Sequence, residues 1–96
     1  MDARQLFRFR DIQGDVTVDM IIWALPKPTV GRLHGLKYRL YCGKNARCVV
    51  RYDNESGKGD HRHYGPREEA YAFESVEKLI ADFKADCEQL AGWVWE

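Results

Sequence analysis

Residues 7–20, Phe-Arg-Phe-Arg-Asp-Ile-Gln-Gly-Asp-Val-Thr-Val-Asp-Met, alternate apolar and polar side chains on either side of a glycine-containing turn. This alternation is typical of a β-hairpin with one buried face. A two-residue turn at Gln13-Gly14 pairs Phe9 with Val18 and Phe7 with Met20. The hairpin then carries its apolar side chains on one face, namely Phe7, Phe9, Val16, Val18, Met20 and Ile22.

A second hairpin is predicted over residues 36–53, with Gly43-Lys44-Asn45 as its loop. These loop residues tolerate left-handed backbone angles, and the turn pairs Leu40 with Cys48. In that register Cys42 and Cys48 share the apolar face, where we expect both to be small core residues. The other face is mostly basic and comprises Lys37, Arg39, Tyr41, Arg47, Val49 and Arg51.

Residues 76–91 recur at helical spacing, with Ser75 as a plausible N-cap and Gly92 where a C-cap is expected. We therefore predict an α+β fold in which an antiparallel sheet of about four strands, formed by two hairpins, packs against one C-terminal helix. The tail Trp93-Val94-Trp95 is unusually apolar, so it either folds back on the core or meets a partner.

The 96 residues are expected to form a single domain, 1–96, because the chain supports only one modest core. Fifteen acidic residues balance fifteen basic ones, which excludes a global electrostatic attraction to nucleic acid. Three cysteines without a C-x-x-C pair favour a reducing compartment. With neither a secretory signal nor an apolar run long enough for a membrane span, we expect a cytoplasmic protein that does not contact membranes.

The stretch Asp53–Gly65 is the densest in titratable groups and holds two of the three histidines. As a loop it would be longer than most connections in compact domains, which favours a functional role. If it is extended, His61 and His63 project to one side and Arg62 to the other. His34 lies in a separate loop and is expected to be simply solvated.

Three functional interpretations compete with a plain solvated loop. The H-x-H pair could bind a metal together with Asp60 or Asp53, although no recognised zinc pattern is completed. The two imidazoles could instead share the proton transfers of RNA cleavage, since each protonation state is accessible near neutral pH. The basic residues could also bind phosphate without chemistry.

Several segments resemble the TumE family of small bacterial proteins: Tyr-Arg-Leu-Tyr at 38–41, Val-Val-Arg-Tyr-Asp-Asn-Glu at 49–55, Gly-Lys-Gly-Asp-His-Arg-His-Tyr-Gly at 57–65 and Tyr-Ala-Phe-Glu-Ser-Val-Glu-Lys-Leu-Ile-Ala-Asp-Phe at 71–83. The resemblance implies the toxin of a toxin–antitoxin module, with a helix-turn-helix antitoxin as its partner. It carries over no active-site role. Many small toxins cleave messenger RNA, so the nuclease interpretation gains support by analogy.

We therefore predict a metal-independent endoribonuclease without a cofactor. Its expected catalytic residues are His61, His63, Lys58, Arg62, Tyr64 and Asp60, with Lys58 and Arg62 stabilising phosphate charge. The expected nucleic-acid contacts are Lys37, Arg39, Arg47, Arg51 and Arg67. The partners expected are RNA, the cognate antitoxin and a second copy in a homodimer, with Trp23, Trp93 and Trp95 as interface candidates. The alternative is a non-enzymatic module that binds nucleic acid or protein.

Overall fold

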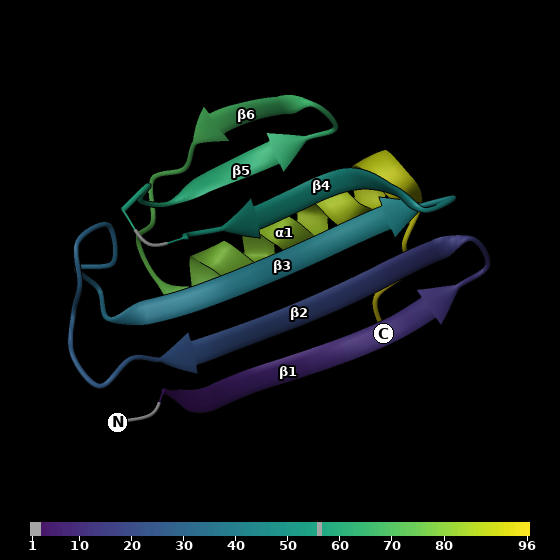
Figure 1. Cartoon of the computed structure of the whole chain (residues 1–96). Coiled ribbons are helices and arrows are strands. Elements are labelled where there is room, and N and C mark those ends of the chain that lie inside the picture. Colours follow the sequence, from purple (N-terminus) through teal and green to yellow (C-terminus); the bar gives the residue numbers. More distant parts are fainter. Residues whose placement is uncertain (1–2, 56) are drawn as a thin grey trace.

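The computed structural model describes residues 3–55 and 57–96, so Ser56, in the polar stretch, lies outside the described residues. Six strands form one antiparallel sheet in which each strand pairs with the next along the chain, and one helix follows (Figure 1). The predicted α+β class is confirmed, but the sheet has six strands instead of about four. The elements are β1 (Arg4–Gln13), β2 (Val16–Ala24), β3 (Leu36–Lys44), β4 (Arg47–Asp53), β5 (His61–Tyr64), β6 (Arg67–Ala70) and α1 (Val76–Ala91).

The first hairpin turns one residue later than predicted. Gln13 pairs with Val16, so Gly14 and Asp15 form the turn, and Gly14 has the positive φ of 59° that such a turn requires. Phe9 therefore lies opposite Met20 and not Val18. Because the pairing moved by two positions, each side chain stays on its predicted face, and Val16, Val18, Met20 and Ile22 are buried.

The second hairpin turns at Asn45-Ala46, not at Gly43-Lys44-Asn45, and both turn residues have positive φ. A β-bulge follows, since Cys42 pairs with Val50 while the next residue, Gly43, pairs with Cys48. The bulge overturns the prediction that Cys42 and Cys48 share a face. Cys42 is fully buried in the core, whereas Cys48 is only partly buried.

The end of the predicted long polar loop, from His61 onward, is part of a third hairpin, and the stretch between Asp53 and His61 is the connection that precedes it. β5 pairs with β4 on one side and with β6 on the other, and Gly65-Pro66 forms the turn. The sequences His-Arg-His-Tyr and Arg-Glu-Glu-Ala lack the apolar alternation that indicates a half-buried strand. Hydrophobic periodicity therefore does not predict these two strands.

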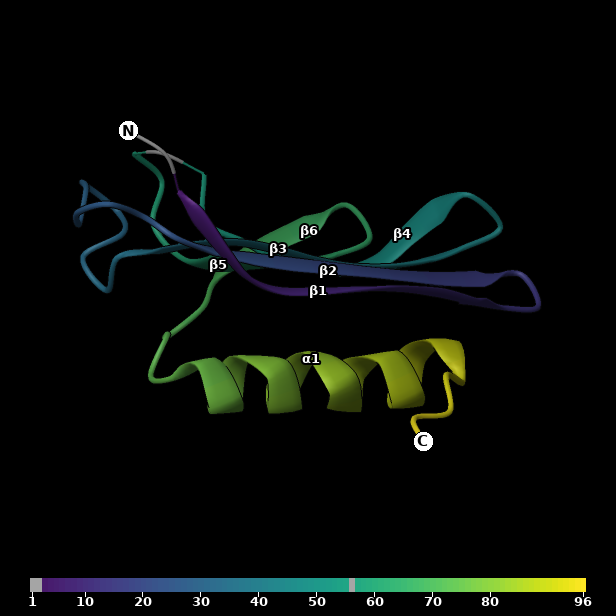
Figure 2. The same ribbon diagram turned by 90° about the horizontal axis from the view of Figure 1, so that it is seen from below.

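α1 covers one face of the sheet and leaves the other open (Figure 2). Its predicted caps are confirmed: Ser75 Oγ accepts a hydrogen bond from Lys78 N, and Gly92 closes the helix with a φ of 72°. Leu79, Phe83 and Cys87 of the helix pack with the apolar side chains of β2, β3 and β4. Among the described residues, no helix is long and apolar enough to cross a membrane.

The apolar tail folds back on the sheet. Trp93 is buried, and the Trp95 ring lies 5.6 Å from the ring of Phe9. The side-chain amide of Gln13 holds the backbone of Val94: its Nε2 donates to Val94 O at 2.8 Å, and its Oε1 accepts from Val94 N at 3.0 Å. Both C-terminal tryptophans thus pack within the chain, which resolves the two predicted alternatives in favour of folding back.

Candidate functional site

Two histidines and one aspartate meet on the open face of the sheet. The pairing of β4 with β5 places His61 opposite Asp53 and His63 opposite Arg51. Since side chains alternate along a strand, both imidazoles extend to one face and Arg62 to the other. The ring centroids of His61 and His63 are 5.0 Å apart, which confirms that the two imidazoles share one side.

Both ring nitrogens of His61 face hydrogen-bond acceptors. Nδ1 lies 3.0 Å from the carbonyl oxygen of Gly59, which can only accept, so Nδ1 carries a proton. Nε2 lies 2.7 Å from Asp53 Oδ1 and 3.4 Å from Glu68 Oε2. Nε2 therefore contacts two carboxylate groups, on the side of the ring opposite to the bond with Gly59.

His63 has the opposite environment. Its Nε2 lies 3.0 Å from Arg51 Nη2, and a guanidinium can only donate, so this nitrogen presents a lone pair. The pKa of His63 is lowered because the ring is withdrawn from water and lies beside the positive charge of Arg51. His63 is therefore neutral and able to accept a proton.

Asp53 links the two imidazoles. Its side chain is 6% exposed, and Arg51 Nε lies 2.9 Å from its Oδ2 atom. Its Oδ1 atom lies 2.7 Å from His61 Nε2 and 3.7 Å from His63 Nε2. Within residues 3–55 and 57–96, however, neither Asp53 Oδ1 nor Arg51 Nε has an aligned hydrogen-bond partner. Asp53 Oδ1 is therefore a buried acceptor with capacity for a further ligand.

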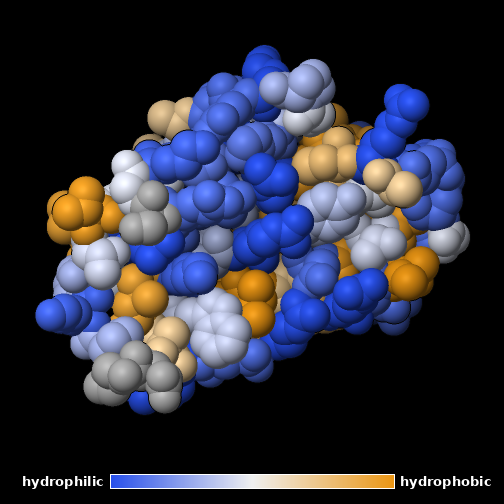
Figure 3. Space-filling view, in the orientation of Figure 1, coloured by the Kyte–Doolittle hydropathy of each residue, from blue (hydrophilic) through white to orange (hydrophobic). Residues whose placement is uncertain are grey.

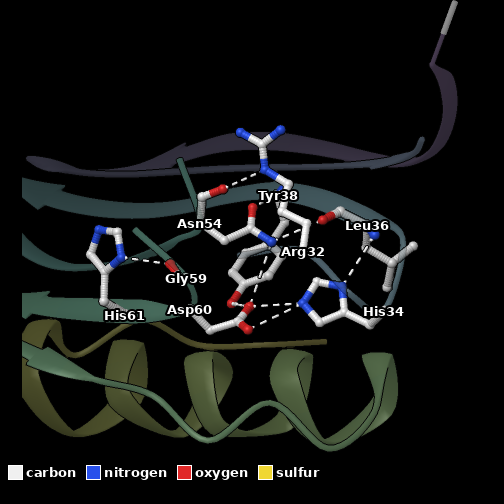
Figure 4. A network of polar contacts seen from close by, with 8 residues as sticks. All are labelled: Arg32, His34, Leu36, Tyr38, Asn54, Gly59, Asp60 and His61. Atoms are coloured by element: carbon white, nitrogen blue, oxygen red, sulfur yellow. Dashed lines mark hydrogen bonds and ion pairs between the residues drawn. The ribbon is translucent and has the colours of Figure 1, made fainter. Parts of the chain in front are cut away.

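A basic cleft adjoins this cluster. It has a volume of about 360 Å³ and is lined by Arg32, Lys37, Tyr38, Arg39, Asp53, Asn54 and Glu55. The guanidinium of Arg32 and the imidazole of His61 both point away from α1 (Figure 4). The surrounding open face is largely hydrophilic (Figure 3). Three cations beside two imidazoles make this region suitable for a phosphate group.

The family model described as Toxin TumE matches residues 4–91, which is nearly the whole chain. The chain belongs to the TumE toxin family. It is accordingly the toxin of a toxin–antitoxin module, and family membership implies an antitoxin partner. This confirms the resemblance found in the sequence. Comparison with curated proteins and with solved structures finds no match.

Two predicted site residues of the toxin lie on the helix face, away from the imidazoles. The guanidinium of Arg62 lies 5.3 to 5.7 Å from the ring centroids of Tyr52, Tyr64 and Tyr71, and its Nε donates to Glu69. The hydroxyl of Tyr64 donates to Asp86 on α1 at 2.7 Å. The structure does not bring Arg62 and Tyr64 together with His61 and His63.

Asp60 belongs to a second polar network, which connects the loop of residues 54–60 to β3 (Figure 4). It accepts hydrogen bonds from the Tyr38 hydroxyl at 2.5 Å and from His34 Nε2 at 3.0 Å. The pKa of Tyr38 is raised, mainly because the hydroxyl is buried and also because it donates a hydrogen bond to Asp60. This hydroxyl therefore remains a donor. His34 also stacks on Phe73 with centroids 4.1 Å apart, so the prediction of a solvated His34 is wrong.

The buried amide of Asn54 holds the same loop in place. Its Oδ1 accepts from Tyr38 N at 3.0 Å, and its Nδ2 donates to Leu36 O at 2.8 Å. Arg32 Nε donates to the carbonyl oxygen of Asn54 at 2.8 Å. These bonds tie Asn54, the residue that follows Asp53, to β3 and to the loop that carries Arg32.

The remaining predicted residues are spread over the toxin. Lys37 and Arg39 line the cleft, and Arg51 lies in the cluster with the imidazoles. Lys58 is exposed in the turn that precedes β5. Arg47 lies at the far end of β4, and Arg67 stacks over Tyr64 at the outer hairpin, so the structure does not bring either of these to the imidazoles.

Neither Arg32 nor Glu68 is predicted from the sequence to act at the site, and Arg51 is predicted only as an RNA contact. Arg51 follows from strand pairing: once His61-Arg62-His63 is recognised as the neighbour of β4, the residues opposite the histidines are Asp53 and Arg51. Glu68 is found in the same way, opposite His63 on β6. Arg32 lacks such a signal, because it reaches the site from the loop between β2 and β3.

Proposed function

We propose that this toxin is a metal-independent endoribonuclease with its active site at Asp53, His61 and His63. The observation that carries the proposal is the convergence of two imidazoles in opposite environments. His61 faces acceptors through both nitrogens, while His63 faces the Arg51 guanidinium. Two titratable groups with such opposed surroundings supply an acid and a base at the same pH.

In the proposed reaction His63 is the general base and His61 the general acid. His63 Nε2 takes the proton of the ribose 2′-hydroxyl once Arg51 turns from the ring to the phosphate. The 2′-oxygen attacks phosphorus, and the leaving 5′-oxygen receives the proton from His61 Nε2. The products are a 2′,3′-cyclic phosphate and a 5′-hydroxyl, and the hydrogen bond from Nδ1 to the carbonyl oxygen of Gly59 orients the His61 ring.

The phosphate charge is stabilised by Arg51, which is adjacent to both imidazoles, with Lys37 and Arg39 holding the neighbouring phosphate in the cleft. Arg51 thereby takes the role that the sequence suggested for Arg62.

Lys58 remains a proposed contact, because it is exposed on the loop that leads into β5. Tyr41 adds an aromatic face on the open side of β3, where the Arg39 guanidinium lies 5.1 Å from its ring centroid.

Incubation of the purified toxin with RNA in excess chelator tests this proposal. We expect cleavage to continue and to yield cyclic phosphate ends. Replacing either imidazole, by His61→Ala or His63→Ala, is expected to slow it by about 10²- to 10⁴-fold, the usual contribution of a general acid or base. Thermal unfolding of each variant checks its fold. Absence of cleavage, or a double variant that cleaves as fast as the wild type, would disprove the nuclease.

The second candidate is a module that binds nucleic acid or protein without turnover, favoured by the basic cleft alone. It predicts salt-sensitive binding that Arg39→Glu weakens more than His63→Ala does.

We further propose that the antitoxin is a helix-turn-helix protein encoded by the adjoining gene, and that the pair acts in the cytoplasm. A proposed homodimer would have to use surfaces other than the packed tail tryptophans. Co-expression with the adjoining gene product, followed by size measurement of the complex, tests both statements.

A further inference from the structure

We propose that Asp53, His61 and His63 form a binding site for a d-block divalent cation, with Zn²⁺ as the ion it fits best. One potential ligand atom from each residue lies within 4.8 Å of the other two. The contacts of Asp53 Oδ1 with His61 Nε2 and His63 Nε2 identify these three atoms as the ligands. Binding does not depend on the proposed nuclease activity. Its consequence does, because the ion would occupy the atoms that transfer protons.

The spacing of these atoms matches a single zinc ion. Zinc bonds to nitrogen and oxygen measure about 2.0 to 2.2 Å, so two ligand atoms at a tetrahedral angle are about 3.3 to 3.6 Å apart. Asp53 Oδ1 lies 2.7 Å from one Nε2 atom and 3.7 Å from the other, on either side of this range. Small rotations of the side chains would bring all three into the first coordination shell.

The second shell already orients two of the three ligands. His61 donates from Nδ1 to the carbonyl oxygen of Gly59, which turns Nε2 toward Asp53. The Oδ2 atom of Asp53 lies against Arg51 Nε at 2.9 Å, which leaves Oδ1 directed at the imidazoles. An imidazole anchored through its other nitrogen is the usual arrangement around protein-bound zinc.

The buried acceptor provides an independent reason to expect a cation. Among the described residues, Asp53 Oδ1 has no aligned hydrogen-bond partner, although its side chain is only 6% exposed. A buried carboxylate oxygen without an aligned donor is costly, and coordination of a cation removes that cost. A chance cluster of histidines at a protein surface would not include a buried carboxylate oxygen of this kind.

Glu68 and Arg51 adjust to complete the site. The Glu68 carboxylate lies 3.4 Å from His61 Nε2 and is 44% exposed, so it is free to move in as a fourth ligand. Arg51 donates to His63 Nε2 and must swing out, which its 29% exposure permits. Two nitrogen ligands favour Zn²⁺ over Mg²⁺, which prefers oxygen ligands and retains its water.

A bound ion would inhibit the proposed nuclease. Coordination occupies the Nε2 lone pair of His63, the proposed base, and replaces the proton that His61 would give to the leaving group. Zinc would therefore stop cleavage without any change of fold, and chelator would restore it.

Titration of the purified toxin with Co²⁺, a spectroscopic substitute for Zn²⁺, tests the site directly. We expect one equivalent to produce visible absorption bands of a nitrogen- and oxygen-ligated ion, and Zn²⁺ but not Mg²⁺ to abolish them. His61→Ala and His63→Ala should each weaken binding at least tenfold. His34→Ala is the matched control, because it removes the third histidine, which pairs with Asp60 elsewhere.

The proposal is overturned if no ion binds at millimolar concentration, or if both site variants bind as tightly as the wild type. Should His61→Ala fail to fold, His63, whose side chain is 16% exposed against 7% for His61, supplies the deciding variant. RNA cleavage in chelator is measured in a separate experiment, so the nuclease proposal can be disproved without affecting the proposal of a metal site. Cleavage that requires Zn²⁺ would disprove both the metal-independent mechanism and zinc inhibition.

Discussion

The hydroxyl of Tyr38 donates a 2.5 Å hydrogen bond to Asp60 Oδ1 and so connects β3 to the loop that carries the chain from Asp53 to His61. Tyr38→Phe removes this bond while leaving the ring in place. Because the acceptor is a partly buried carboxylate, we expect the free energy of unfolding to fall by about 1.5 to 3 kcal/mol. Urea denaturation of the two proteins measures the difference.

Tyr41→Phe is the matched control for this change. Tyr41 occupies the same strand, but within the described residues its hydroxyl makes no hydrogen bond to protein, and its ring lies over Gly43. The loss should be less than about 0.5 kcal/mol. Equal losses at Tyr38 and Tyr41 would show that the bond to Asp60 contributes nothing.

Arg51→Gln tests the assignment of charge stabilisation to Arg51 instead of Arg62. Arg51 is the guanidinium in contact with His63 and Asp53, whereas Arg62 lies among tyrosines on the other face. Removing the charge beside the reacting phosphate should lower the cleavage rate by about 10²-fold. Single-turnover cleavage at saturating toxin measures the chemical step.

Arg47→Gln serves as its control, because Arg47 lies on the same strand at the opposite end from the imidazoles. We expect it to reduce RNA affinity slightly and to leave the single-turnover rate close to wild type. A rate loss as large as that of Arg51→Gln would place the reacting phosphate elsewhere on the sheet.

The sequence predicts those elements whose signals lie within a short stretch of the chain. Ser75 and Gly92 specify both ends of the helix, and the alternation in residues 7–20 specifies the first hairpin. Both hairpin registers were nevertheless wrong, because the turn position depends on which residues adopt positive φ. In the first hairpin the register differs from the predicted one by two residues, and such a shift keeps every side chain on its face of the sheet. The buried residues of β2 are therefore predicted correctly.

The sequence predicts only part of the site, because the remaining residues join it through pairing between strands. The histidine pair was visible as H-x-H, but Arg51 and Asp53 join it through pairing between β4 and β5. β5 and β6 have polar side chains on both faces, so hydrophobic periodicity does not reveal them. His34 depends on a contact across 26 positions in the chain, which local patterns do not encode.

Asp82 is expected to make part of the stability pH-dependent. Burial raises its pKa, but hydrogen bonds from Lys78 and from the Tyr71 hydroxyl, each 2.7 Å, outweigh this and lower it below the ordinary value of 3.8. A lowered pKa in the folded state stabilises the protein above pH 3.8, and this stabilisation is lost as the pH falls through the folded-state pKa. Asp82→Asn should therefore be less stable than wild type at pH 6.

The difference in unfolding free energy between wild type and Asp82→Asn should remain constant down to about pH 5 and shrink below pH 3.8. Thermal unfolding at intervals from pH 3 to pH 7 measures it. Glu77→Gln, on the first turn of the same helix, controls for the general effect of removing an acidic side chain. A difference that grows toward low pH would reverse the assigned direction of the pKa shift.

Gly31 packs directly against the loop that positions His61, and its replacement should damage both stability and function. A Cβ atom there would lie 2.8 Å from Gly59 N and 3.3 Å from Gly59 Cα, and neither backbone atom can rotate away. Gly35 has almost the same φ, 77° against 78°, but a Cβ there meets no described atom within 4 Å. Both alanine variants therefore carry the backbone strain of a positive φ, about 1 to 2 kcal/mol, and only Gly31→Ala adds a collision.

We expect Gly31→Ala to lose about 1 to 3 kcal/mol more unfolding free energy than Gly35→Ala, the usual cost of overpacking. The collision displaces Gly59, whose carbonyl oxygen holds His61 Nδ1. Gly31→Ala should therefore also weaken Co²⁺ binding and slow RNA cleavage at temperatures where it remains folded, and Gly35→Ala should do neither. If the two variants behave alike, the contact between these loops does not position the imidazole, and the orientation of His61 must come from its pairing within the sheet.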